Sequence, residues 1–82
     1  MDKLDLVLES VQTEYLRARK KFPAFNSTHE GYAVLLEEVD ELWNEVKTNS
    51  KALAVGEAKQ VAAMAVAFLV DLYGLDELKD NL

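Results

Sequence analysis

A run of ten apolar residues, from Val61 to Val70, lies inside a chain of only 82 residues. Lys59 stands before the run and Asp71 ends it, so it is too short to span a bilayer, and we expect no membrane partner. A helix built on this run is apolar on every face, which is typical of a helix buried all round at the centre of a fold. The run therefore predicts a central helix.

The remainder of the chain also has helical patterning, because one proline and three glycines leave few breaks. Apolar residues in steps of three and four predict a first helix from about Leu4, with Asp2 as its N-cap, that ends before Pro23. The segment Ser27-Thr28-His29-Glu30 has the form of a capping box, so a second helix should begin there and run to about Thr48.

The third helix is expected from about Lys51 to Tyr73, with Gly74 just beyond its end, and the tail from Leu75 to Leu82 predicts a short fourth helix. Residues 1–82 therefore form a single all-α domain with three main helices plus a short C-terminal helix. Half of the chain is apolar, which is more than so small a domain can cover by itself. We therefore expect at least a homodimer, and the sequence does not distinguish a dimer from a tetramer.

Composition excludes several classes of function. The net charge of −6 and a pI near 4.6 predict repulsion from nucleic acid and from anionic membranes, so neither is expected as a partner. The chain has no cysteine, which removes disulfides, thiolate metal sites and thiol nucleophiles. The first residues lack the order of a signal peptide, and we expect a cytoplasmic protein.

Two acidic groups of residues lie on neighbouring predicted helices. Glu38 and Glu41 are three residues apart on the second helix, and Glu57 and Gln60 have the same spacing on the third. Antiparallel helices joined within the intervening fifteen residues would bring the two groups level. Together they would make an oxygen-rich cage of the kind that Mg²⁺ or Mn²⁺ prefers. The alternative is a solvated acidic face with nothing bound.

The segment Leu36-Glu37-Glu38-Val39-Asp40-Glu41-Leu42 resembles the E-E-x-x-E-L motif of the MazG-like all-α nucleotide pyrophosphohydrolase superfamily. Glu57-Ala58-Lys59-Gln60-Val61 falls where that family has E-x-x-D-V. The resemblance covers residues 27–72, about half the chain. It implies a four-helix-bundle core shared between subunits of a homo-oligomer.

The resemblance also implies Mg²⁺-dependent cleavage of a nucleoside triphosphate to a monophosphate and pyrophosphate, with non-standard nucleotides among the substrates to consider. Glu38, Glu41, Glu57 and Gln60 would then hold the metal, and Glu37 would orient or deprotonate the attacking water. Gln60 departs from the family's aspartate and supplies no charge, which weakens the site and puts activity in doubt. On this reasoning, Gln60→Asp should strengthen metal binding.

Four further residues are candidates for binding the substrate. Lys20 and Lys21 suit the outer phosphates, although basic residues at the end of a helix also interact favourably with its dipole. Trp43 could stack on a base, and His29 could contact substrate at the start of the second helix, but core packing and solvent exposure are the simpler alternatives. Phe22 and Phe25 could stack in the same way, with core or interface packing again the simpler interpretation. Base and sugar preference are not given by the sequence.

Two other functions fit the same residues. The chain could be a MazG-like helical module that binds a nucleotide or a partner without turnover, or a purely structural dimerisation unit. Gln60 favours both of these alternatives. The position of Glu57 and Gln60 on an otherwise apolar helix favours a site.

Overall fold

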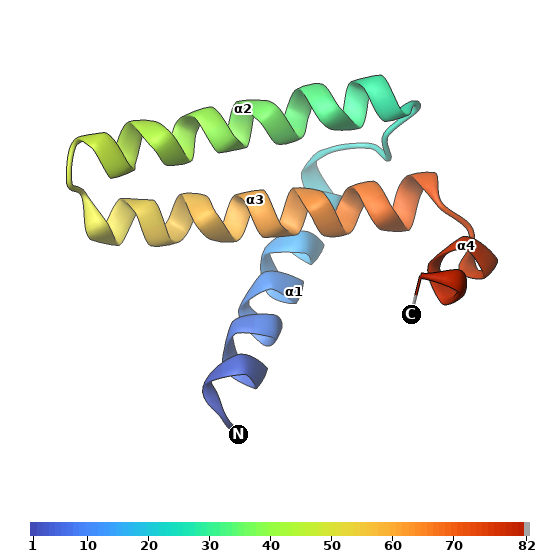
Figure 1. Cartoon of the computed structure of the whole chain (residues 1–82), viewed down its shortest axis with the longest axis horizontal. Coiled ribbons are helices and arrows are strands. Elements are labelled where there is room, and N and C mark those ends of the chain that lie inside the picture. The colour runs from blue at the N-terminus through green and yellow to red at the C-terminus, as the bar shows by residue number, and fades with distance from the viewer. Residues whose placement is uncertain (82) are drawn as a thin grey trace.

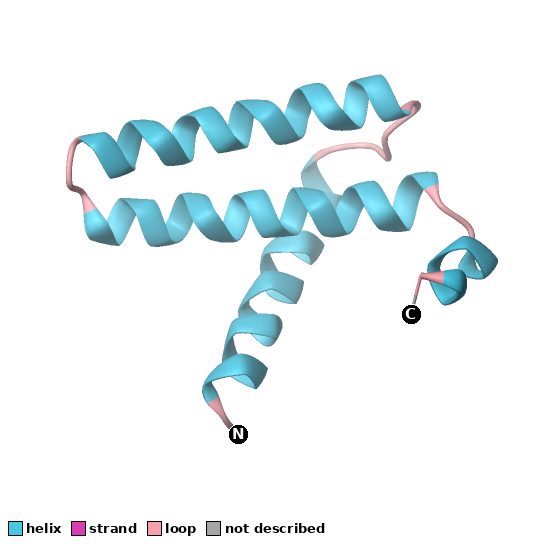
Figure 2. Cartoon of the chain, viewed as in Figure 1, coloured by secondary structure: helices cyan, strands magenta, loops and turns pink. Residues whose placement is uncertain are grey.

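The computed structural model describes residues 1–81 and is all-α over that range. It contains four helices, α1 (Lys3–Lys21), α2 (Thr28–Lys47), α3 (Lys51–Leu72) and α4 (Leu75–Asp80). Figure 1 shows α2 and α3 as an antiparallel hairpin, with α1 crossing α3 steeply on the other side. Short connections join the helices (Figure 2). The three long helices and the short fourth confirm the sequence prediction, except that Leu82 lies outside the described residues.

The helix starts follow from their capping residues. The carboxylate of Asp2 accepts a hydrogen bond from the Asp5 amide at 2.9 Å, and the Ser27 hydroxyl accepts one from the Glu30 amide at 3.1 Å. The Glu30 carboxylate reaches back one residue further than a capping box requires and accepts from the Asn26 amide at 3.0 Å. These bonds satisfy amides that the first turns leave without helical partners.

Two connections are set by local backbone geometry. Asn49, between α2 and α3, has a φ of 61°, a left-handed conformation that asparagine tolerates better than most residues. Gly74 does follow the end of α3, as predicted, but its φ of −82° is not left-handed, and it serves as the N-cap of α4. The α3–α4 junction is therefore an extended link.

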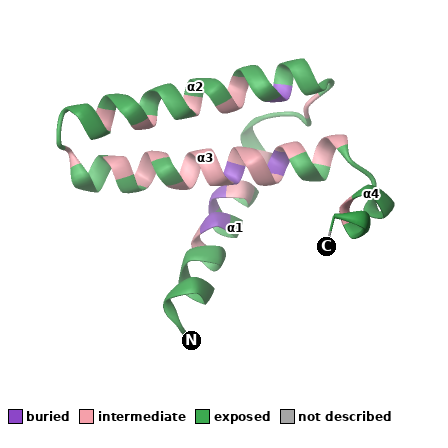
Figure 3. Cartoon of the chain, viewed as in Figure 1, coloured by how far each residue is buried: buried purple, intermediate pink, exposed green. Residues whose placement is uncertain are grey.

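Helix α3 is central, as its apolar run predicts. Among residues 1–81, both α1 and α2 pack on α3 and not on each other. The buried apolar residues are Val11 on α1 with Ala63 and Ala67 on α3, and Figure 3 shows this small core where α1 crosses α3. The expectation that α3 is buried all round is wrong for a single chain, because Leu69 and Val70 remain about half exposed.

Gly31, near the start of α2, lies against side chains from the end of α3. A methyl group added at Gly31 would lie 2.6 Å from Cδ2 of Phe68 and 3.2 Å from Cδ1 of Leu72. No side chain fits at that distance without displacing the Phe68 ring. The absence of a side chain at Gly31 therefore leaves room for the Phe68 and Leu72 side chains of α3.

Helix α2 does not pack on α3 through its most apolar stripe. Gly31 is buried and Leu35, Glu38 and Leu42 are partly buried, whereas Tyr32 and Trp43 are 62% and 58% exposed. Other large apolar side chains of the same stripe are also exposed: Leu36, Val39 and Val46. Glu38, expected at the boundary of the apolar face, thus turns toward α3. The uncovered stripe is the surface that a second copy would be expected to cover, and the oligomer stays a prediction.

By length and composition α3 could also cross a membrane, since an 18-residue window within it has a mean hydropathy of 1.6. The core helix of a water-soluble domain passes the same test, so this is weak evidence.

Candidate metal centre

Three carboxylates converge in the middle of the α2–α3 hairpin. Glu38 and Glu41 extend from α2 and Glu57 extends from α3, and one oxygen from each lies within 4.8 Å of the others. The antiparallel pairing of the two helices brings them level, as the spacing of the acidic residues predicts. We call Glu38, Glu41 and Glu57 the acidic cluster.

Burial and mutual repulsion disfavour the ionised forms of Glu38 and Glu57 in the acidic cluster. Burial, followed by the nearby Glu41 carboxylate, raises the pKa of Glu38 to about 7. The same two causes raise the pKa of Glu57, and Glu45 adds to the effect. Glu57 is half-buried as a residue, but its Oε2 is buried and has no hydrogen-bond partner among residues 1–81. A buried oxygen of that kind normally has a donor or a cation beside it.

Gln60, the fourth predicted ligand, makes its hydrogen bond to a different helix. Its Nε2 donates to Oε2 of Glu14 on α1 at 2.6 Å. Glu14 is only 8% exposed and also accepts from Arg17. Sequence reasoning missed Glu14, although a signal was present, because this acid directly precedes Tyr15 in the apolar stripe that packs α1 on α3.

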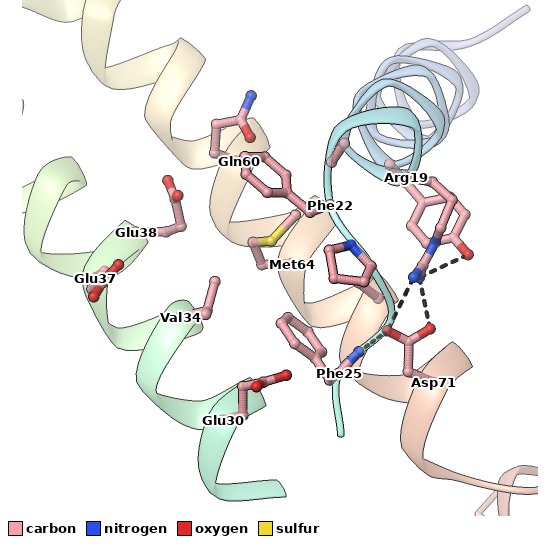
Figure 4. Close-up of a pocket in the computed structure, with 14 residues that line it drawn as sticks. Arg19, Phe22, Phe25, Glu30, Val34, Glu37, Glu38, Gln60, Met64 and Asp71 are labelled. Atoms are coloured by element: carbon pink, nitrogen blue, oxygen red, sulfur yellow. Dashed lines mark hydrogen bonds and ion pairs between the residues drawn. The ribbon is translucent and has the colours of Figure 1, made fainter. Parts of the chain in front are cut away.

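A cavity of about 440 Å³ adjoins the acidic cluster. Glu37, Glu38 and Gln60 border it at one end, and aromatic and apolar side chains line much of the rest, among them Tyr15, Phe22, Phe25 and Met64. Figure 4 shows Gln60 and Glu38 together at one end of this cavity, with Asp71 and Phe25 toward the other. Glu38 therefore belongs to both the cluster and the cavity lining, and the exposed Glu37, the candidate catalytic residue, borders the same end of the cavity.

A partly buried ion pair between Arg19 and Asp71 lines the far end of the cavity. Asp71 accepts from both terminal nitrogens of Arg19, at 2.7 and 3.2 Å, and from the Phe25 amide at 2.9 Å. Arg19 also donates to the Tyr15 hydroxyl at 3.1 Å, and its pKa is raised mainly by the hydrogen bond to Asp71. This network ties α1 and the α1–α2 connection to the end of α3, so Arg19 has a structural role (Figure 4).

The four residues predicted to bind substrate lie outside the cavity lining. Lys20, Lys21 and His29 are exposed, and so is Trp43 on the uncovered stripe of α2. The lysines form no ion pair within the described part of the chain. The aromatic side chains that do border the cavity include Phe22 and Phe25, which the sequence also offers as residues able to stack on a base.

Comparison with models of protein families, with curated proteins and with solved structures finds no match to this chain. The candidate site must therefore be judged on its own geometry.

Proposed function

We propose that the acidic cluster binds Mg²⁺ or Mn²⁺ and that the chain is a metal-dependent nucleoside triphosphate pyrophosphohydrolase. The observation that supports it most directly is the buried, unpartnered Oε2 of Glu57, which lies in a group of three carboxylates whose oxygens approach within 4.8 Å. These are hard oxygen donors that form no ion pair among residues 1–81. Burial and the neighbouring Glu41 carboxylate raise the pKa values of Glu38 and Glu57, and a divalent cation would offset that cost of holding charge.

The bound ion would offset the charge of the phosphates and lower the pKa of a nearby water molecule. The cavity beside Glu38 would hold the base against Phe22 and Phe25, with the phosphates directed toward the cluster. Glu37 would accept a proton from the attacking water. The water oxygen would bond to the α-phosphorus as the bond to the bridging oxygen breaks, and pyrophosphate would leave.

A second copy of the chain belongs to the same proposal. The exposed stripe on α2, with Trp43 and Tyr32 more than half exposed, offers an apolar surface for it. The resemblance noted above implies subunits that share a helical core, so a dimer or tetramer is the expected working unit.

The direct test is pyrophosphate release from a panel of nucleoside triphosphates, standard and non-standard, in Mg²⁺ or Mn²⁺. We expect release from at least one, and loss of release in Glu57→Gln. The matched control is Glu9→Gln, which removes an exposed acid on α1 away from the cluster. No release from any member of the panel, with either ion, would contradict the enzymatic proposal.

The second candidate is a helical module that binds metal and nucleotide without turnover. The neutral side chain of Gln60 favours it, because the site then offers only three negative charges. Such a module would show a rise in melting temperature with Mn²⁺ and nucleotide but no product. A purely structural dimerisation unit would show neither effect.

A further inference from the structure

A hydrogen bond between Gln60 and Glu14 links α1 to the neighbourhood of the acidic cluster. The distance between Gln60 Nε2 and Glu14 Oε2 is 2.6 Å, a short hydrogen bond of the charge-assisted kind. Glu14 is nearly buried, at 8% exposed, and Arg17 donates to its other oxygen. Gln60 also borders the cavity, as Glu38 of the cluster does.

This contact fixes which atom of the amide faces which way. An ionised carboxylate accepts hydrogen bonds but donates none, so Glu14 must face the nitrogen of the Gln60 amide. The carbonyl oxygen, Oε1, is then the atom left for a cation or a polar ligand. With the amide free to rotate, the nitrogen would occupy that place part of the time, and a nitrogen that carries hydrogens repels a cation.

The contact also accounts for an amide at this position. A carboxylate at residue 60 would have no hydrogen to donate and would meet Glu14 at close range in a largely buried setting. Two buried carboxylates in contact are strongly unfavourable. Glutamine is the side chain that can both donate to Glu14 and keep an oxygen available.

We infer that Glu14 is a positioning residue: its carboxylate holds the Gln60 amide so that Oε1 serves as a neutral oxygen ligand at the edge of the acidic cluster. This inference rests on the proposed metal site and adds the element that orients one of its ligands. Residues that orient ligands in this way typically change metal affinity by about 10- to 100-fold when removed.

The inference alters the effect expected of changes at residue 60. Gln60→Asp, which the sequence alone predicts to strengthen metal binding, should do so only together with Glu14→Gln. The cleanest form is the exchange Glu14→Gln with Gln60→Glu, which reverses donor and acceptor, keeps both side-chain lengths and adds a negative charge beside the cluster.

The test measures Mn²⁺ affinity by calorimetry for the full chain, with the melting temperature without metal measured in parallel. We expect Glu14→Gln to weaken Mn²⁺ binding about tenfold. The exchange variant should bind Mn²⁺ more tightly than the wild type, because a carboxylate replaces a neutral amide near the ion. Gln60→Glu alone should lower the melting temperature, and the exchange should restore it. Glu9→Gln, another acid-to-amide change on α1, should leave the affinity within about twofold.

The outcomes separate the two hypotheses. A wild-type chain that binds no Mn²⁺ overturns the proposed metal site, and with it the role of Glu14. A wild-type chain that binds Mn²⁺ while Glu14→Gln binds it equally well overturns only the positioning role. An exchange variant that binds no more tightly than Glu14→Gln would also overturn that role. Neither Glu14→Gln nor the exchange variant places two carboxylates in contact, so both should fold. The test therefore remains valid even if Gln60→Glu alone does not fold.

Discussion

Asp71 and Glu57 are two carboxylates on one helix, about four turns apart and therefore on similar sides of α3, yet their surroundings are opposite. Asp71 accepts two hydrogen bonds from Arg19 and one from the Phe25 amide. Glu57 has carboxylate neighbours, a raised pKa and a buried oxygen without a partner among residues 1–81. The fold therefore supplies hydrogen-bond donors and a positive charge to Asp71, whereas Glu57 has no positively charged partner among residues 1–81.

We infer from this difference that Asp71 stabilises the fold and that the charge of Glu57 destabilises it. Asp71 joins α1, the α1–α2 connection and α3, and its side chain is only 6% exposed. Among residues 1–81 the Glu57 side chain forms no ion pair and its Oε2 has no hydrogen-bond partner, and the Glu41 and Glu45 carboxylates repel its negative charge. Removing the partner of the first should therefore cost stability, and neutralising the second should add to it. That contrast in sign is the basis of the predictions below.

The largest effect is expected at the satisfied carboxylate. Arg19→Met should lower the free energy of unfolding by about 2 kcal/mol, because it leaves Asp71 charged and buried with only the Phe25 amide as donor. The value is below that of a fully buried pair because the Arg19 side chain is 29% exposed. Urea unfolding at one fixed protein concentration measures it. Lys20→Met, next in sequence and exposed, is the control; an equal loss there would contradict the assignment.

The next effect tests the hairpin that carries the unsatisfied carboxylate. Gly31→Ala should destabilise the chain by about 1 kcal/mol, since the added methyl would lie 2.6 Å from the Phe68 ring. Better helix propensity offsets part of the cost. Gly56→Ala is a matched control, because nothing lies within 4 Å of a methyl group there, and it should stabilise the chain. If both substitutions stabilise, α2 and α3 are not as close as described.

A smaller effect of opposite sign is expected at Glu57. Glu57→Gln should raise the stability of the metal-free chain by about 0.5 kcal/mol, the size typical of relieving one like-charge contact at a partly exposed site. The same substitution should abolish the stabilisation that Mn²⁺ gives to the wild type. Thermal unfolding with and without Mn²⁺ measures both. A loss of stability without metal would show that Glu57 has a favourable partner after all.

The last prediction is a dependence of stability on pH, which tests the raised pKa of Glu38. The pKa of Glu38 is raised from 4.5 to about 7 in the folded chain, so between these values the folded state holds more protons than the unfolded state. Stability of the metal-free chain should therefore fall as the pH rises from about 5 to 8. Saturating Mn²⁺ should remove or reverse that slope, because the ion binds the ionised carboxylates. In Glu38→Gln the slope should become shallower; a slope equal to that of the wild type would contradict the assignment to Glu38.

The sequence predicted the helices well because their signals are local. Asp2, Ser27 and Pro23 mark helix ends through their own backbone and side-chain chemistry, and the apolar run of α3 identifies the central helix. The acidic cluster could also be predicted from the sequence, since residue spacing and one antiparallel hairpin suffice to bring its members together.

The contacts of α1 could not be predicted in the same way. The bonds from Glu14 to Gln60 and from Arg19 to Asp71 join residues far apart in sequence, and they depend on the angle at which α1 crosses α3. The sequence also did not predict which face of α2 packs on α3. The face that contains Gly31 packs against Phe68 of α3, while the more apolar stripe around Trp43 is exposed.

Helices α1 and α2 each pack on α3 and not on one another, so the residues of the candidate site come from two separate parts of the chain. The charges that would attract an ion all come from one continuous stretch of chain, residues 28–72. Glu14, the residue proposed to orient the Gln60 amide, comes from outside that stretch. If the proposed site binds an ion, substitutions in α1 would change its affinity while every carboxylate in the hairpin stays unchanged.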